Sequence, residues 1–145
     1  GRPVEVILDG NPLATLTTAD DGSFEIVVPA KRAGPHVLAV VASRGGYLEA
    51  TSGTLRFRAV SAPLAVTSLA LSGSALSWRL PTPDEDRPIQ EVRVYAQSPG
   101  EPWRKVATLP PDAAAFDASQ ASGARSFGVV ALNVAGESPW ATVSR

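Results

Sequence analysis

The sequence predicts an all-β fold with two antiparallel domains in tandem. Short runs alternate between apolar and polar residues with a period of two, as in Val4–Leu8 and Leu55–Val60. Such alternation places one row of side chains in a core and the other row on the opposite face of a strand. Clusters of turn-forming residues separate these runs, and Asp9-Gly10-Asn11-Pro12 is typical of a hairpin turn. A chain of short strands joined by turns is therefore expected.

In the first half, a meander of strands and turns is predicted. Turns are expected at Asp9–Pro12, Ala19–Gly22 and Lys31–Pro35 because glycine, proline and aspartate favour turn geometry. Arg44–Gly53 contains three glycines and is predicted to be a loop or a short irregular edge. The strands expected between these breaks are Val4–Leu8, Leu13–Thr18, Ser23–Val28, His36–Ser43 and Leu55–Val60.

In the second half, strands follow a short proline-terminated join at residues 60–63. Trp78 is expected to be a central core residue, whereas residues 112–124 have a weak pattern. Gly136 and Pro139 are expected to end the strand that begins at Phe127. The expected strands are Val66–Leu71, Ala75–Leu80, Ile89–Ala96, Trp103–Leu109, Ala114–Phe116, Phe127–Leu132 and Ala141–Arg145.

Two stretches resemble known families. The motif VxAxNxxGxS at residues 129–138, together with Trp78-Arg79-Leu80-Pro81 and Pro88-Ile89, resembles fibronectin type III domains. The segments PVEVILDG, PLATLTTADDGSFEIVVPA, GPHVLAVVAS and LRFRAV resemble bacterial immunoglobulin-like domains. The resemblance implies two antiparallel β-sandwiches, an immunoglobulin-like domain over residues 1–60 and a fibronectin type III-like domain over residues 61–145. It also places Val92 and Arg125 where the second family commonly has tyrosines.

The first sandwich is expected to lack its first strand, because the family has a strand before the position of Val4. A partner chain, a preceding segment or Leu64–Leu71 would then have to complete it. The short join predicts a semi-rigid connection between the domains. Protein partners are accordingly expected at sheet edges or loop ends, with a homo-oligomer as one form of that contact.

Composition excludes several classes of function. The chain of 145 residues has a net charge of −1, so we expect no nucleic-acid partner. It contains no cysteine, which removes disulfides and thiolate chemistry, and no apolar run long enough for a membrane helix. We expect no cofactor. Thirteen prolines and two asparagines fit a heat-adapted, thermostable protein, although a GC-rich genome would bias the composition in the same way.

Few residues carry catalytic or metal-binding chemistry. His36 is the only histidine, and no nucleophile motif accompanies it. The acidic groups Asp20-Asp21 and Asp84-Glu85-Asp86 lie in predicted turns without the spacing of a calcium loop. Arg56, Arg58, Arg79 and Arg93 lie on polar strand faces, where arginine is usually solvated or ion-paired. No enzyme, catalytic residue or metal site is therefore predicted.

The aromatic residues offer the best candidates for ligand contact. Trp103 and Trp140 each follow a proline at the start of a predicted strand, which could leave a ring face open for stacking on a sugar. Tyr47 and Tyr95 are further aromatic candidates. We predict a structural or adhesive module of an extracellular assembly, such as a surface filament, an adhesin or a phage tail or decoration protein. The alternative is a carbohydrate-binding or spacer module of a larger secreted bacterial enzyme.

Overall fold

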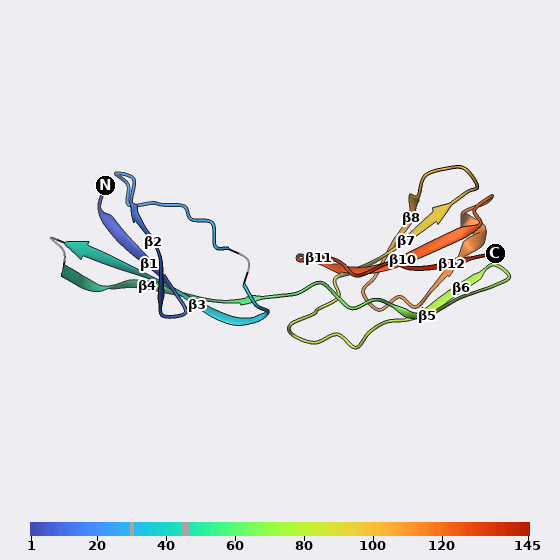
Figure 1. Cartoon of the computed structure of the whole chain (residues 1–145), viewed down its shortest axis with the longest axis horizontal. Coiled ribbons are helices and arrows are strands. Elements are labelled where there is room, and N and C mark those ends of the chain that lie inside the picture. The colour runs from blue at the N-terminus through green and yellow to red at the C-terminus, as the bar shows by residue number, and fades with distance from the viewer. Residues whose placement is uncertain (30, 45–46) are drawn as a thin grey trace. The chain divides into compact units, whose positions relative to one another are not determined.

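The computed structural model has the all-β, antiparallel fold that the sequence predicts (Figure 1). It describes residues 1–29, 31–44 and 47–145, and the side chains of residues 1–29, 31–42 and 53–145. Contacts within the chain divide it into unit 1, Gly1–Ala59, and unit 2, Val60–Arg145. The part of the chain described contains no helix with the length and apolar character that crossing a membrane requires.

Unit 1 contains one four-stranded antiparallel sheet in the order β2-β1-β3-β4. Its first hairpin closes through Asp9 and Gly10, whose φ angles of 52° and 81° are those of a type I′ turn. This turn matches the right-handed twist of the strands and explains why Asp-Gly occurs here. The strands are β1 (Pro3–Leu8), β2 (Asn11–Thr17), β3 (Gly34–Arg44) and β4 (Tyr47–Ala59).

One strand prediction for unit 1 is wrong, and the prediction for Arg44–Gly53 is confirmed in part. The predicted strand Ser23–Val28 has no strand assignment, although its side chains still alternate: Ile26 and Val28 are half-buried, whereas Val27 is 85% exposed. Alternation therefore determines which side chains face inward, but it does not provide a neighbouring strand for hydrogen bonding. Arg44–Gly53, predicted to be a loop or a short irregular edge, contributes to β3 and to the edge strand β4, whose register with β3 shifts here; residues 45 and 46 lie outside the description.

Unit 2 contains two antiparallel sheets that enclose a core. In the larger sheet, β10 pairs with β7, β11 and β12, and β7 also pairs with β8. Its strands are β7 (Glu91–Gln97), β8 (Arg104–Leu109), β10 (Ser126–Asn133), β11 (Gly136–Glu137) and β12 (Ala141–Ser144). The smaller sheet has β5 (Thr67–Ser72), β6 (Ala75–Arg79) and β9 (Ala115–Asp117) in the order β5-β6-β9.

In unit 2, one predicted alternative is wrong and one element is present that was not predicted. Leu64–Leu71 does not complete the sheet of unit 1, because β5 pairs with β6. A short 3-10 helix, η1 (Ala118–Gln120), lies in the segment whose pattern is weak. It begins where the carboxylate of Asp117 accepts a hydrogen bond from the Ser119 backbone, and hydrogen bonds from Ser119 lower the pKa of Asp117.

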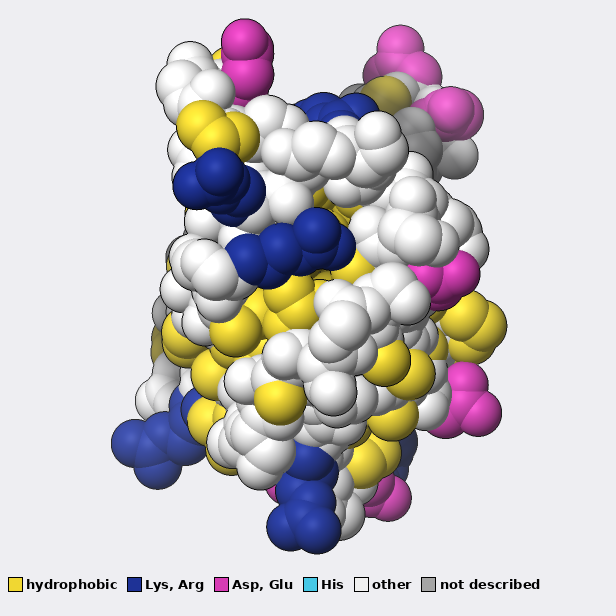
Figure 2. Space-filling view, turned by 90° about the vertical axis from the view of Figure 1, so that its right-hand side faces the viewer, with side chains coloured by type: hydrophobic (Ala, Val, Ile, Leu, Met, Phe, Trp, Pro, Cys, Tyr) yellow, Lys and Arg dark blue, Asp and Glu magenta, His cyan; other side chains and the backbone are white. Residues whose placement is uncertain are grey.

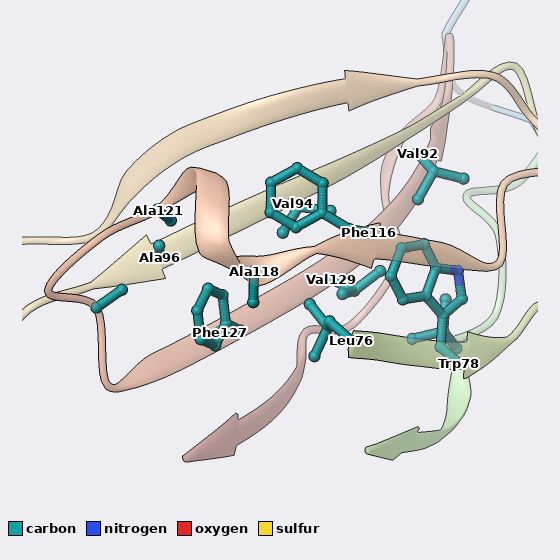
Figure 3. Packing of buried hydrophobic residues seen from close by; sticks show 12 residues of the cluster. Leu76, Trp78, Val92, Val94, Ala96, Phe116, Ala118, Ala121, Phe127 and Val129 are labelled. Atoms are coloured by element: carbon teal, nitrogen blue, oxygen red, sulfur yellow. The ribbon is translucent and has the colours of Figure 1, made fainter. Parts of the chain in front are cut away.

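The core of unit 2 is filled from both sheets (Figure 3). Leu76 and Trp78 of β6 face Val94 of β7 and Phe127 of β10 across the space between the layers. Trp78 is 5% exposed, as predicted, and its indole N–H donates to the Ala113 carbonyl at 2.8 Å. A buried indole N–H needs such a partner, so this hydrogen bond allows the large ring to occupy the core.

Two buried polar residues organise the end of β10, and both belong to the motif that carries the resemblance. The Asn133 amide donates to the carbonyls of Ser61 and Pro88 at 2.7 and 2.8 Å, and its oxygen accepts from the Ala135 backbone. The Ser138 hydroxyl accepts from the Ala131 backbone at 3.0 Å. These contacts satisfy backbone groups that the turn would otherwise leave unpaired. The motif therefore has a structural role in unit 2.

Candidate functional site

Three aromatic side chains form a cluster on the outer face of the larger sheet of unit 2. We call Tyr95, Trp103 and Trp140 the aromatic platform. Trp103 directly precedes β8, which pairs with β7, and Trp140 directly precedes β12, which pairs with β10. The ring centroids of Trp103 and Trp140 are 5.4 Å apart in an edge-to-face arrangement, and those of Tyr95 and Trp140 are 4.5 Å apart. Such contacts stabilise the rings against one another.

A glycine allows Trp140 to lie close to the sheet. Gly128 of β10 pairs with Tyr95 of β7, so the two residues are neighbours on the outer face. A Cβ atom at Gly128 would lie 2.7 Å from the Trp140 ring, which is closer than such atoms approach. Residue 128 must therefore lack a side chain for the indole to occupy its present position. Gly128 lies within the strand expected at Phe127–Leu132, but no local pattern indicates this role.

A carboxylate connects the platform to a basic side chain. Glu137 accepts hydrogen bonds from the Trp140 indole N–H and the Tyr95 hydroxyl, each at 3.3 Å. One terminal guanidinium nitrogen of Arg93 lies 3.9 Å from the same carboxylate, while its Nε donates to Glu91 at 2.6 Å. The hydrogen bond to Glu91, followed by that to Tyr95, raises the pKa of Arg93. The platform is thus held by a hydrogen-bonded network along one edge.

The structure brings the predicted stacking residues Trp103 and Trp140 together, and their rings contact each other. Trp103 and Trp140 are 36% and 41% exposed, and both belong to the platform. Tyr95 is half-buried, and its ring contacts that of Trp140 as the third ring of the platform. The side chain of Tyr47 lies outside the description. The three residues lie together because they are on or next to the paired strands around β7 and β10. The sequence alone does not show this pairing.

His36 is part of a hydrogen-bonded connection within unit 1. One ring nitrogen lies 2.7 Å from the Asp9 carboxylate and the other lies 2.7 Å from the Arg32 carbonyl. Asp9 also accepts from the Val37 backbone at 2.9 Å. The Arg32 carbonyl, followed by Asp9, raises the pKa of His36, and the Val37 and His36 hydrogen bonds lower the pKa of Asp9. One ring nitrogen therefore joins the first hairpin to β3, and the other joins β3 to the segment that precedes it.

The predicted acidic loops also use their carboxylates to organise the backbone. Asp84 accepts from the backbone of Asp86 and Arg87 at 2.9 and 2.8 Å. Asp21 accepts from the Ser23 backbone and hydroxyl, and these hydrogen bonds lower the pKa of Asp21. Within the described residues, no group of three or more His, Cys, Asp or Glu side chains could hold a metal ion.

A second surface lies at the loop end of unit 2. A shallow hollow there is lined by Pro99, Gly123, Ala124, Arg125 and Arg145. Arg125 and Arg145 are both exposed, and their backbones are joined by a hydrogen bond of 2.8 Å. On the face drawn in Figure 2, Lys and Arg side chains border a patch of hydrophobic side chains. This surface carries positive charge without the ordered aromatic rings of the platform.

Comparisons with known proteins show a similarity in fold. No protein-family model and no curated protein matches the sequence. Among solved structures, the FN1-FN3 domains of chicken CNTN1 match 99% of this chain with 14% identity and a TM-score of 0.53. A two-domain fibronectin type-III segment of chicken tenascin matches 99% of the chain with 12% identity and a TM-score of 0.41.

The likeness to CNTN1 confirms the predicted resemblance in fold. This chain spans 54% of the length of that chain, so the similarity covers a part of a longer domain array. Folds of this type host many unrelated functions, and function has to be argued from particular residues.

Proposed function

We propose that the chain is a non-catalytic structural or adhesive module of an extracellular assembly, in which unit 1 makes protein contacts through its sheet edges. One observation carries this proposal. In the described part of unit 1, β2 pairs only with β1 and β4 pairs only with β3, so the sheet has two edges. An edge strand offers backbone donors and acceptors to a strand of another chain.

Apolar side chains near these strands support the proposal. Leu55 on β4 is 59% exposed, and Val27 and Phe24 of the neighbouring extended segment are 85% and 39% exposed. A sheet with exposed apolar side chains and free edges favours association with another protein surface. A surface filament, an adhesin and a phage tail or decoration layer all use such contacts, and the proposal covers these settings.

The polar chemistry of the chain supports a non-catalytic role. The nitrogens of His36 contact Asp9 and Arg32, and the amide of Asn133 contacts backbone carbonyls. Both ring nitrogens of the one histidine are thus engaged within unit 1, which leaves neither open to a substrate for general acid–base catalysis. Turnover of any substrate that His36→Gln abolishes without unfolding unit 1 would contradict this part of the proposal.

Light scattering of the purified chain over a wide concentration range, with negative-stain images of the same samples, tests the edge contacts. A discrete oligomer or filament is expected, and Leu55→Lys should weaken it because a charge on an edge strand opposes pairing. Val134→Lys, at an 80% exposed site in unit 2, is the matched control and should leave assembly unchanged. A monomer at every concentration would contradict the proposal that copies of this chain assemble with one another.

A further inference from the structure

We propose that the aromatic platform of Tyr95, Trp103 and Trp140 binds a neutral polysaccharide by stacking on the apolar faces of its sugar rings. This binding site lies in unit 2 and is separate from the edge contacts proposed for unit 1. Four properties of the platform carry the inference: its exposed aromatic area, its rigidity, the contacts between its rings and the balance of charge around it.

The platform presents aromatic surface on a face that points away from the core. Phe127 and Val129 of β10 face the core, so Gly128, which alternates with them, faces outward beneath Trp140. Phe116, Phe127 and Trp78 are at most 8% exposed, whereas Trp103 and Trp140 retain 36% and 41% of their surface. Unit 2 therefore buries these three aromatic side chains but leaves two adjacent indoles accessible.

The rings are held in place before any ligand arrives. Trp140 rests on Gly128, contacts Tyr95 and Trp103, and donates its indole N–H to Glu137. Arg93 and Tyr95 contact the same carboxylate, so Glu137 is itself oriented. A side chain that is already ordered loses little conformational entropy on binding, which favours affinity. This rigidity distinguishes the platform from a pair of isolated surface tryptophans.

The contacts between the rings favour a flat ligand over a cation. A cage for an ammonium group needs aromatic faces that surround an open space. Here the centroid separations of 4.5 and 5.4 Å bring the rings into contact with one another. The accessible surface is therefore the outside of the cluster, which suits a ligand that lies against it. A sugar ring has such a face, formed by its C–H groups, with hydroxyls around the edge.

The charges around the platform are balanced. Arg93 and Glu91 form an ion pair, and Glu137 lies beside them. Lys105 of β8 is paired with Tyr95 across the strands and so faces the same side of the sheet. Arg93 and Lys105 thus share this face of the sheet with Glu91 and Glu137, and this mixture of charges complements a neutral ligand better than a polyanion. The carboxylates accept hydrogen bonds from hydroxyls and the cations donate to them, so the border suits a polyhydroxylated chain.

Affinity electrophoresis of the whole chain tests the proposal. Native gels would contain barley β-glucan, glucomannan or dextran as neutral probes and alginate as a polyanionic probe. We expect retardation by at least one neutral probe and a loss of affinity of at least tenfold in Trp140→Ala, which corresponds to about 1.4 kcal/mol. Phe24→Ala replaces an exposed aromatic residue of unit 1 and should bind as the unaltered chain does.

Two measurements separate loss of binding from loss of folding. Circular dichroism and urea unfolding should show that Trp140→Ala retains unit 2, and Trp140→Tyr, which keeps a ring, should recover part of the affinity. If Trp140→Ala does not fold, quenching or blue-shift of tryptophan fluorescence in the unaltered chain on titration with the retarding glycan, absent in Trp103→Ala, is the expected result.

The inference would be overturned by the absence of retardation with every neutral probe. Retardation by alginate alone, equal retardation of Trp140→Ala and the unaltered chain, or a dimer that Trp140→Ala dissociates would overturn it as well. The light-scattering test of the edge contacts is independent of these outcomes, because it changes Leu55 in unit 1.

Discussion

Unit 1 and unit 2 are made of the same kind of alternating strands, but they bury different cores. Among the described side chains of unit 1, the buried hydrophobic residues are Val4, Val6, Leu8 and Val41. Unit 2 has two sheets, and Trp78, Phe116 and Phe127 meet between them. The comparison teaches that alternation defines an inward face, whereas a closed core also requires large side chains from a second paired layer.

The largest predicted difference between the two units is in the stability lost when one buried leucine of each unit is replaced by alanine. Leu76 of unit 2 and Leu8 of unit 1 are 0% and 3% exposed. Replacing a buried leucine by alanine costs about 2–5 kcal/mol, and the cost rises when the cavity cannot collapse. We expect Leu76→Ala near the upper end and Leu8→Ala near the lower end, because unit 2 is enclosed by two sheets. Urea unfolding should resolve two transitions, each displaced by its own variant. Equal losses, or one shared transition, would remove the distinction between the units.

A second prediction concerns the buried polar side chains that unit 2 has and that the described part of unit 1 lacks. Asn133→Asp keeps the shape of the side chain and the acceptor for Ala135, but it cannot donate to the carbonyls of Ser61 and Pro88. Leaving a buried polar group unsatisfied costs about 1–3 kcal/mol, and an ionised carboxylate placed against two carbonyl oxygens costs more. The unfolding midpoint of unit 2 should fall accordingly, while Val134→Ala at the adjacent exposed site should have little effect. An unchanged midpoint would mean that water replaces these hydrogen bonds.

A third prediction separates the units by pH. The pKa of His36 is raised above 6.5, so its contribution to stability is complete below pH 6.5 and is lost as pH rises through the folded-state pKa. The pKa of Asp9 is lowered below 3.8, so its contribution is present above pH 3.8 and is lost as pH falls through the folded-state value. The pair should therefore stabilise unit 1 most between about pH 4 and 6.5.

Urea midpoints measured from pH 3 to pH 9 test this dependence. The midpoint of unit 1 should decline above pH 6.5, and His36→Gln should flatten that decline. His36 is the only histidine in the chain, so the transition of unit 2 provides an internal control over the same interval. A decline that persists in His36→Gln would assign the pH dependence to another group.

The smallest effect on stability is expected for Gly128→Ala. The added methyl group would displace the Trp140 ring, which is partly exposed and can move outward. Loss of aromatic packing should cost about 1 kcal/mol or less, but the near-ultraviolet circular dichroism of the Trp103–Trp140 pair should change clearly. Gly53→Ala changes a glycine of unit 1 with open space around it and should leave that signal intact. An unaltered spectrum in Gly128→Ala would show that the glycine does not hold Trp140 in place.

Sequence patterns predicted most strands, but they did not show which residues come together at the candidate site. The Asp9-Gly10 hairpin and the core position of Trp78 follow from local turn chemistry and alternation, and both are present in the structure. The strand expected at Ser23–Val28 failed because an extended segment needs a neighbour with free backbone groups. Trp103 and Trp140 were candidates from their own positions, but Tyr95, Gly128 and Glu137 join them through pairing across β7, β10 and β11.

The sequence by itself determined that this protein is all β, where most of its strands begin and end, and which side chains of each strand face inward. These properties depend on near neighbours along the chain, namely residues two positions apart and the residues of a turn. Only the tertiary structure decided that unit 2 closes a two-layered core, that Asn133 joins three parts of the backbone, and that two indoles meet over Gly128. The physical reason is that strand register and layer packing bring together residues far apart in sequence, and no local pattern encodes their distance.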